Sequence, residues 1–292
     1  MLFKNAVVLT GDFTFKKCDI KTSGETIIEV GENIAPDVGF VIDASDKIIV
    51  PGLVDIHTHG CIGYDSSQAK DLETINEMSK FYAAHGTTTY FPTIESNSKD
   101  ATLSAVEILS YAINKGVTGA NIGGIHMEGP YFSPKYKGAQ NESCLRLPDI
   151  DEFRMLYEKS RKNIKLISLA PELEGALDFI RQASEMCSVA IGHTDADYDE
   201  AKKAIDCGAR VLTHSFNGMR PLHHRNPNAI GASLESNIFC EFICDGFHIS
   251  KTVIKLIYCL ISDNRMVLVS DSLRAAGMDD GTYELAGLPV IG

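Results

Sequence analysis

Apolar and polar residues alternate in blocks along most of this chain. From Leu53 onward, short apolar runs typical of buried strands are followed by polar or amphipathic stretches. Eight such runs begin near Leu53, Thr87, Ala120, Ile164, Ser188, Arg210, Phe239 and Met266. Helical spacing of apolar residues is found at Asp71–His85, Asp100–Lys115, Ile150–Arg161, Leu173–Cys187, Asp197–Cys207 and Ser250–Leu260, with Ser98 and Ser250 as N-caps of two of these helices. Eight strand–helix units in series predict a parallel (β/α)8 TIM-like barrel rather than a doubly wound sheet.

The first fifty residues have a different pattern, with short β-branched segments separated by turns. The predicted strands are Leu2–Leu9, Thr14–Ile20 and Thr26–Val30. The pattern changes at Pro51–Gly52. We therefore expect two domains, a small N-terminal β-sandwich unit at residues 1–50 and the barrel at residues 51–280. Residues 281–292 are a candidate extra part of the β unit.

Composition and charge narrow the class of protein. The chain has 292 residues, 44% hydrophobic and 23% charged, which is ordinary for a globular protein and excludes a disordered one. A chain of this length can fold without a metal, so any metal that it binds is expected to be catalytic. Its 27 Lys and Arg against 39 Asp and Glu give a net charge of −12, which argues against a nucleic-acid partner but leaves room for a small anionic substrate.

The cysteines and the longest apolar run indicate where the protein works. The eight cysteines form no CxxC pair and lie mostly in apolar or small-residue runs, so we expect free, reduced thiols and a cytoplasmic location. The run Val253–Ile261 is interrupted by Lys255 and is too short to cross a bilayer, and the N-terminus lacks the apolar core of a signal peptide. We therefore expect neither a membrane span nor a membrane partner.

Residues able to bind a metal follow the predicted strands, where a barrel places its active site. They are His57 and His59 after the first strand, Glu128 after the third, His193 after the fifth, His214 after the sixth and Asp271 after the eighth. Because residues two apart on a strand face the same way, the two histidines of His57-Thr58-His59 can reach one ion. Glu128 can bridge two ions with its two oxygens.

Each of these residues also has an ordinary interpretation. A histidine at a strand end is often a buried group with hydrogen-bond partners, Glu128 fits an exposed turn, and Asp271 fits a helix N-cap. His126, two residues before Glu128, is interpreted as structural rather than as a ligand. Five strand ends that carry only His, Glu or Asp together favour one metal centre.

With these residues in place, the sequence resembles the amidohydrolase superfamily and, within it, the N-acetylglucosamine-6-phosphate deacetylase group. The resemblance runs from about Pro51 to the last residue, and the N-terminal strands fit it too. It is carried by the motifs Pro51–Gly60, His126–Pro130, Gly192–Thr194, Thr213–Met219 with His223–Arg225, Asp245–His248 and Asp271–Gly277.

The resemblance implies a role for each matching position. Glu128, His193 and His214 match the main metal ligands. His57 and His59 match a pair that holds a second ion together with Glu128 and Asp271, so one or two divalent ions (zinc, iron, manganese or cobalt) are expected. Asp271 also matches the catalytic acid/base. The positions that match substrate contacts are Ala139, Gln140, Asn217, Gly218, Arg225 and His248.

The implied reaction is hydrolysis of the acetamide of N-acetyl-D-glucosamine 6-phosphate to glucosamine 6-phosphate and acetate. A divalent ion makes hydroxide available by lowering the pKa of bound water from 15.7 to roughly 7, and Asp271 would carry the proton from that water to the leaving amine. Arg225 is expected to reach the phosphate across the interface of a homodimer. At Gln140 many relatives have His; Gln can donate a hydrogen bond but carries no charge.

The chain also departs from the family in length. Family members usually continue past Gly292, so we expect a barrel that is incomplete at its C-terminal end, without the segment that returns strands to the β unit. Two alternatives stay open. One is a related amidohydrolase acting on another N-acetyl amino-sugar phosphate or a cyclic amide, and the other is an inactive, truncated barrel.

Overall fold

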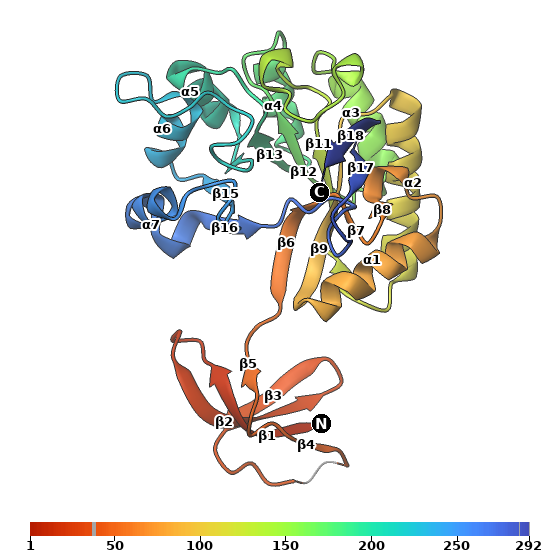
Figure 1. The fold of residues 1–292 in the computed structure, drawn as a ribbon, viewed down its shortest axis with the longest axis vertical. Helices are drawn as coiled ribbons and strands as arrows, with labels where there is room; N and C mark the ends of the chain where they lie inside the picture. The colour runs from red at the N-terminus through yellow and green to blue at the C-terminus, as the bar shows by residue number, and fades with distance from the viewer. Residues whose placement is uncertain (37–38, 286, 292) are drawn as a thin grey trace. The chain divides into compact units, whose positions relative to one another are not determined.

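The computed structural model describes residues 1–36, 39–285 and 287–291. The chain divides into two compact units, Met1–Leu53 and Val54–Gly292 (Figure 1). Each unit is described by itself.

The first unit is one mixed sheet of five strands in the order β3-β2-β1-β4, with β5 also paired to β1. The strands are β1 Leu2–Leu9, β2 Phe15–Ser23, β3 Thr26–Gly31, β4 Val41–Asp43 and β5 Ile48–Ile49. The three strands predicted from the sequence are confirmed, and they pair antiparallel in chain order. The two short strands were missed because only two or three residues of each are paired, along an edge of β1.

The second unit is built around eight parallel strands. They are β6 Leu53–Thr58, β9 Thr87–Ile94, β11 Ile125–Glu128, β12 Ile164–Leu169, β13 Ser188–Ile191, β14 Val211–Leu212, β15 Phe239–Ile243 and β16 Met266–Val269. Seven of them begin within one residue of the predicted position; the third, β11, begins five residues after Ala120, where the short strand β10 (Asn121–Ile122) lies instead. β6 pairs with β9, and the remaining strands follow in chain order from β9 through β11 to β16. The two-residue strand β10 pairs with Thr89 and Tyr90 in the N-terminal half of β9.

The barrel is nearly closed, because the end of β16 returns to β6. The amide of Asp271 donates to the carbonyl of His57 at 2.9 Å, and Thr58 forms a parallel bridge with Ser272. The buried carboxylate of Asp55 accepts from the amide of Ser270 at 3.3 Å. The predicted TIM-like barrel is therefore confirmed. Its closure places the first and last strand ends side by side.

Helices lie around the outside of the strands (Figure 1). They are α1 Leu72–Ala84, α2 Lys99–Lys115, α3 Ile150–Lys159, α4 Ala176–Ala183, α5 Tyr198–Cys207, α6 Asn228–Leu234 and α7 Lys251–Arg265. Six were predicted, and the caps Ser98 and Ser250 accept from the amides of Ala101 and Val253. Helix α4 begins three residues later than predicted, after Gly175 at φ +79°. Helix α6 was missed because its seven small or apolar residues are nearly all buried and show no polar face.

Short elements complete the second unit. They are β7 Gly60–Cys61, β8 Tyr64–Asp65, β17 Thr282–Leu285 and β18 Leu288–Ile291, with single turns of 3-10 helix at η1 Ser66–Gln68, η2 Pro134–Tyr136 and η3 Glu142–Cys144. β17 and β18 pair only with each other among the described residues. No described helix has the length and apolar character needed to cross a membrane.

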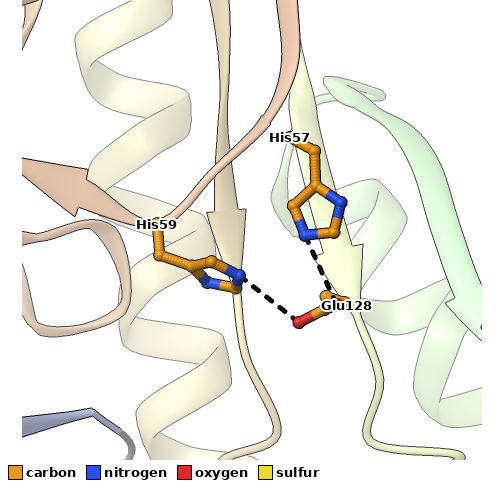
Figure 2. Close-up of side chains that lie close together, drawn as sticks. All are labelled: His57, His59 and Glu128. Atoms are coloured by element: carbon orange, nitrogen blue, oxygen red, sulfur yellow. Dashed lines mark ion pairs between the residues drawn. The ribbon is translucent and has the colours of Figure 1, made fainter. Parts of the chain in front are cut away.

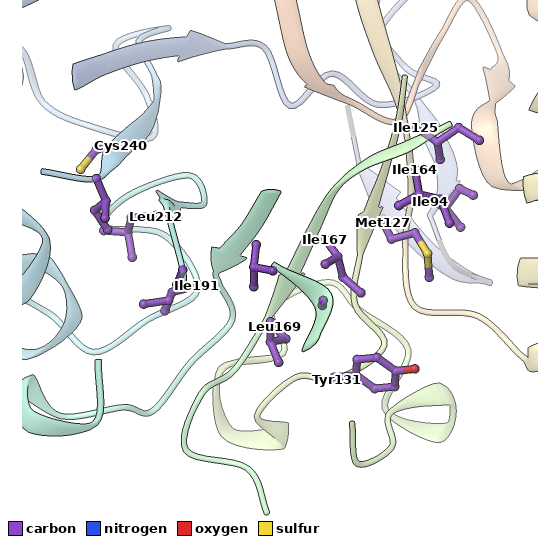
Figure 3. Close-up of a cluster of buried hydrophobic side chains, with 14 of the residues drawn as sticks. Ile94, Ile125, Met127, Tyr131, Ile164, Ile167, Leu169, Ile191, Leu212 and Cys240 are labelled. Carbon is purple, nitrogen blue, oxygen red and sulfur yellow. The ribbon is translucent and has the colours of Figure 1, made fainter. Parts of the chain in front are cut away.

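The main core lies between the barrel strands and the helices. Figure 3 shows strand residues of this core, among them Met127, Leu169, Ile191 and Leu212. Because side chains alternate along a strand, the outward position of Met127 turns its neighbours His126 and Glu128 into the barrel. The same alternation in β15 turns Glu241 inward. Polar groups thus reach the barrel interior from strands whose outer faces are apolar.

Candidate metal centre

The structure brings together the six side chains predicted as metal ligands. Each comes from the C-terminal end of a strand or from the residues just after it, where parallel barrels form their sites. The strands and residues are β6 (His57, His59), β11 (Glu128), β13 (His193), β14 (His214) and β16 (Asp271). Five of these side chains are less than 10% exposed, and that of Asp271 is 21% exposed.

Glu128, His193 and His214 form the first group that could hold an ion. Glu128 Oε1 lies 3.2 Å from His193 Nε2 and 3.0 Å from His214 Nε2, and the two Nε2 atoms are 3.1 Å apart. His193 Nδ1 donates to the carbonyl of Tyr136 at 2.8 Å, and His214 Nδ1 donates to that of Asn217 at 3.1 Å. Since carbonyls only accept, the hydrogen of each neutral ring is on Nδ1, and both Nε2 lone pairs point at one spot.

His57, His59 and Glu128 form the second group, shown in Figure 2. Their Nε2 atoms approach different oxygens of Glu128, at 3.3 Å for His57 and 3.4 Å for His59. Asp271 Oδ1 lies 3.4 Å from His57 Nε2 and 3.3 Å from His59 Nε2. Glu128 thus belongs to both groups, as a carboxylate that bridges two ions would.

The donor atoms fit a divalent cation. A tetrahedral ion with ligands at about 2.1 Å holds neighbouring ligand atoms about 3.4 Å apart, and the contacts above range from 3.0 to 3.4 Å. His57 Nε2 is buried and finds no hydrogen-bond partner among the described residues, as expected of a nitrogen reserved for a metal. Imidazole and carboxylate donors suit zinc, iron, manganese or cobalt.

The electrostatics of the two groups also fit a cation. Burial disfavours the charged form of His57, but the carboxylates of Asp271 and Glu128 outweigh burial and raise the pKa of His57 well above its usual value. Burial likewise opposes ionisation of Glu128, yet His57 and His193 hold its pKa well below the usual value. The ionised carboxylates of Glu128 and Asp271 are therefore stabilised by positive charge nearby. A bound cation would supply that charge in place of the protons on the histidines.

The loops that carry the ligands have an unusual backbone. His193, His214 and Asp271 have φ values of +44°, +24° and +49°, a region that residues other than glycine rarely adopt. Such conformations persist only where the surroundings enforce them, and they concentrate at functional sites.

Buried carboxylates that the sequence analysis did not single out stand behind the ligands. Glu241 of β15 faces His57, and Glu95, directly after β9, has Oε2 3.7 Å from His59 Nδ1 and in contact with Ser67 Oγ. Glu95 could have been found from the sequence, because it directly follows a predicted strand, as the candidate ligands do. The signal for Glu241 was a single acid within the apolar strand Phe239–Ile243.

His126 is the one histidine at the strand ends that belongs to neither candidate group. Its Nε2 lies 2.8 Å from Ser168 Oγ, and its Nδ1 lies 3.4 Å from Thr93 Oγ1. Its ring packs edge-on against His57 with the centroids 4.5 Å apart. These contacts are what the structural interpretation of His126 predicts.

A cavity of about 390 Å³ opens onto the candidate ligands. Five of the six predicted substrate contacts line it, namely Ala139, Gln140, Asn217, Gly218 and His248. Gln140 donates to Glu128 Oε2 at 2.5 Å, so it contacts the bridging carboxylate directly. His248 holds its Nδ1 2.7 Å from Asp245 Oδ2.

Arg225 does not line this cavity. It is exposed and lies in a separate groove of about 870 Å³, together with Arg220 and His223. The prediction that Arg225 reaches the site of a partner subunit stays a prediction.

The family model described as the amidohydrolase family matches residues 48–282. The chain belongs to the amidohydrolase family. Its curated relatives include N-acetylglucosamine-6-phosphate deacetylases of Vibrio furnissii (37% identical, 81% of this chain and 59% of the relative) and Bacillus subtilis strain 168 (36%, 84% and 63%). An N-acetylgalactosamine-6-phosphate deacetylase of Escherichia coli O157:H7 is 34% identical over 85% of this chain and 66% of the relative. The chain thus spans about 59–66% of the length of these relatives.

Solved structures of this family have the same fold. A mutant N-acetyl-D-glucosamine-6-phosphate deacetylase of Mycobacterium smegmatis, in complex with N-acetyl-D-glucosamine-6-phosphate, superposes with a TM-score of 0.91 at 32% identity and covers 100% of this chain and 75% of its own. The N-acetylglucosamine-6-phosphate deacetylase of Pasteurella multocida superposes with a TM-score of 0.92 at 27% identity. The match covers 100% of this chain and 76% of the Pasteurella chain. The barrel predicted from the strand pattern is therefore the barrel of amidohydrolases.

Proposed function

We propose that this protein is a metal-dependent deacetylase of amino-sugar 6-phosphates, which converts N-acetyl-D-glucosamine 6-phosphate to glucosamine 6-phosphate and acetate. The observation that carries the proposal is the pair of His–carboxylate groups that share Glu128 at the floor of the 390 Å³ cavity. The relatives named as deacetylases of such sugars support the choice of substrate.

Glu128, His193 and His214 would hold one divalent ion, and His57, His59, Glu128 and Asp271 would hold a second. When bound, such an ion supplies hydroxide at neutral pH and polarises the amide carbonyl. The chain holds the ligands in place before binding, because Tyr136 and Asn217 carbonyls fix two of the imidazoles.

Asp271 is the group proposed to move the proton. It lines the cavity, and although burial opposes ionisation, His57 and His59 lower the pKa of Asp271, so that it is a carboxylate ready to accept. It takes the proton of the attacking water and delivers it to the nitrogen of the scissile amide, because an amide anion is too poor a leaving group. One side chain then acts as base and afterwards as acid.

The remaining cavity residues would bind and orient the sugar. Asn217 and the Gly218 amide are proposed to contact the sugar phosphate, with Ala139 and Gln140 as further contacts. His248, whose ring is oriented by Asp245, is proposed to donate to the oxyanion that forms on the carbonyl oxygen. Arg225 would add a phosphate contact from the partner subunit of a homodimer.

A second candidate substrate is N-acetylgalactosamine 6-phosphate. The relative of Escherichia coli O157:H7 is named for that sugar, and it is nearly as similar to this chain as the relatives named for N-acetylglucosamine 6-phosphate. The two sugars differ only in the configuration of one hydroxyl, so a panel assay that includes both decides between them.

We further propose a cytoplasmic location without nucleic-acid partners, because all eight cysteines are free thiols and the net charge is −12.

The test is acetate release by the purified, metal-loaded chain with each acetylated sugar phosphate. His193→Asn is expected to lose most bound metal and turnover together. Asp271→Asn is expected to keep the metal of the Glu128–His193–His214 group but to lose about 10²–10⁴-fold in rate, because the proton carrier is gone. An unchanged rate in Asp271→Asn would reject its role, and a metal-loaded chain that releases no acetate from any sugar of the panel would reject the function.

A further inference from the structure

Glu241 is a buried acid in a strand that is otherwise apolar. Its neighbours Cys240 and Phe242 pack in the core outside the barrel, whereas the Glu241 side chain points inward and is completely inaccessible to solvent. A buried carboxylate is costly unless it has specific partners. The position therefore calls for a reason beyond the packing of β15.

The contacts of Glu241 join two of the strands that carry ligands. Its Oε2 lies 3.1 Å from His57 Nδ1 and accepts from the amide of His214 at 3.2 Å. Glu241 belongs to neither candidate ligand group. Glu241 thus contacts the imidazole of His57 and the backbone of His214, on the side of His57 that faces away from Glu128.

We propose that Glu241 is a positioning residue that fixes the ligating form of His57 and thereby sets how tightly the His57–His59 half of the centre holds its cation. Because the carboxylate accepts, it keeps a hydrogen of His57 on Nδ1, so Nε2, which lies beside Glu128 and Asp271, is the nitrogen left for a cation. The same bond prevents the ring from rotating. Outer hydrogen-bond partners of this kind typically alter metal affinity by about 10–100-fold.

His59 provides an internal comparison. The nearest carboxylate behind its ring, Glu95, is 3.7 Å from Nδ1, and this nitrogen finds no hydrogen-bond partner among the described residues. Of the two histidines, His57 is therefore the one with a formed outer bond. Loss of Glu241 should consequently weaken the His57–His59 half most, because only there does it contact a ligand side chain, and it should affect the other half less, through the amide of His214. A packing role would affect the stability of β15 alone.

The inference rests on the metal centre of the proposed function but not on its substrate, so the test uses Co²⁺ alone. The chain is titrated with Co²⁺, and the visible spectrum, the bound stoichiometry and the two dissociation constants are measured by competition with a chelator. Glu241→Met fills the same space without an acceptor and is expected to weaken one of the two Co²⁺ equivalents about 10–100-fold. Glu241→Gln keeps a carbonyl acceptor and is expected to retain most of that affinity.

The matched control is Glu152→Met, at a buried carboxylate of α3 that pairs with Arg146 and Lys99 and touches no ligand. It should lower the melting temperature and leave both Co²⁺ equivalents unchanged. If Glu241→Met does not fold, Glu241→Asp is used in its place. The shorter side chain withdraws the carboxylate from His57 by one methylene, and the same loss of Co²⁺ affinity is expected. Equal affinities in the folded Glu241 variant and the parent, an equal loss of both equivalents, or a parent that binds only one Co²⁺ would each overturn the inference. A parent that binds no Co²⁺ would overturn the proposed metal centre itself.

Discussion

At the scale of single residues, the geometry of the centre depends on a glycine as well as on the ligands. Gly218 has φ +59°, and a Cβ built on it would lie 2.9 Å from His193 Nδ1 and 3.1 Å from Cε1. His193 Nδ1 is also the atom that donates to the Tyr136 carbonyl. Any side chain at residue 218 must therefore push against the His193 imidazole, a proposed metal ligand.

We predict that Gly218→Ala weakens metal binding about tenfold, because the methyl group displaces His193 from its bond to Tyr136. The positive φ adds a cost of about 1–2 kcal/mol to the free energy of folding. Gly175→Ala is the matched control, since Gly175 has φ +79° but no atom within 4 Å of its built Cβ. Chelator competition and urea unfolding measure the two effects, and equal metal affinities in the two variants would contradict the steric argument.

At the scale of elements, one buried carboxylate joins several segments of the first unit. Asp19 of β2 accepts from Lys4 Nζ of β1 at 2.7 Å, from the Asn5 amide at 2.8 Å and from the Ile34 amide at 2.9 Å. Burial raises the pKa of Asp19, but the bonds from Lys4 and the two amides outweigh burial and lower it. The interaction joins β1, β2 and the segment that follows β3.

The sign of the pH dependence follows from that lowered pKa. The contribution of Asp19 is complete above the unfolded value of about 3.9 and is lost as the pH falls through the lower folded value. We predict that Asp19→Asn reduces protection of β1 and β2 amides at pH 7 by about 1–3 kcal/mol. The difference between parent and variant should shrink below about pH 4. Hydrogen exchange, corrected for the intrinsic exchange rate at each pH, measures this difference in protection. A difference that grows in acid would contradict the role assigned to the Asp19 carboxylate.

At the scale of the whole second unit, the proposed metal centre depends on closure of the barrel. The ligands come from five strands, and the hydrogen bond from Asp271 to His57 joins the last strand end to the first. A cation bound to Glu128 would therefore link segments that are more than 200 residues apart along the chain. Binding to the folded state alone stabilises that state by mass action.

We predict that metal removal lowers the melting temperature of this unit. At a free metal concentration of 100 times the Kd the stabilisation is about 2.7 kcal/mol, which corresponds to about 5–10 °C for a unit of this size. Thermal unfolding followed by circular dichroism, with and without chelator, measures the shift. Glu128→Gln, which changes the carboxylate common to both candidate groups, serves as the control and should shift much less on chelator treatment than the parent chain. A parent chain whose melting temperature does not change on addition of chelator would show that no ion links these strands.

The amino-acid sequence by itself determined the succession of elements and the residue types of the candidate metal centre. Apolar runs bounded by turns marked all eight barrel strands, and the helices with polar outer faces were found, because burial leaves a periodic trace in the chain. The ligand types could also be predicted, because a parallel barrel gathers its strand ends at one rim. The fully buried helix α6 left no such trace.

Only the tertiary structure decided which groups support the ligands and which do not reach them. Alternation along a strand gives the face of Glu241 but not its distance to His57, since that distance depends on how strands far apart in sequence are staggered around the closed barrel. The loop after β14 likewise carries Asn217 and Gly218 into the cavity and Arg225 into a separate groove. Spacing along the chain does not encode such a separation, because it arises from the path of an irregular loop.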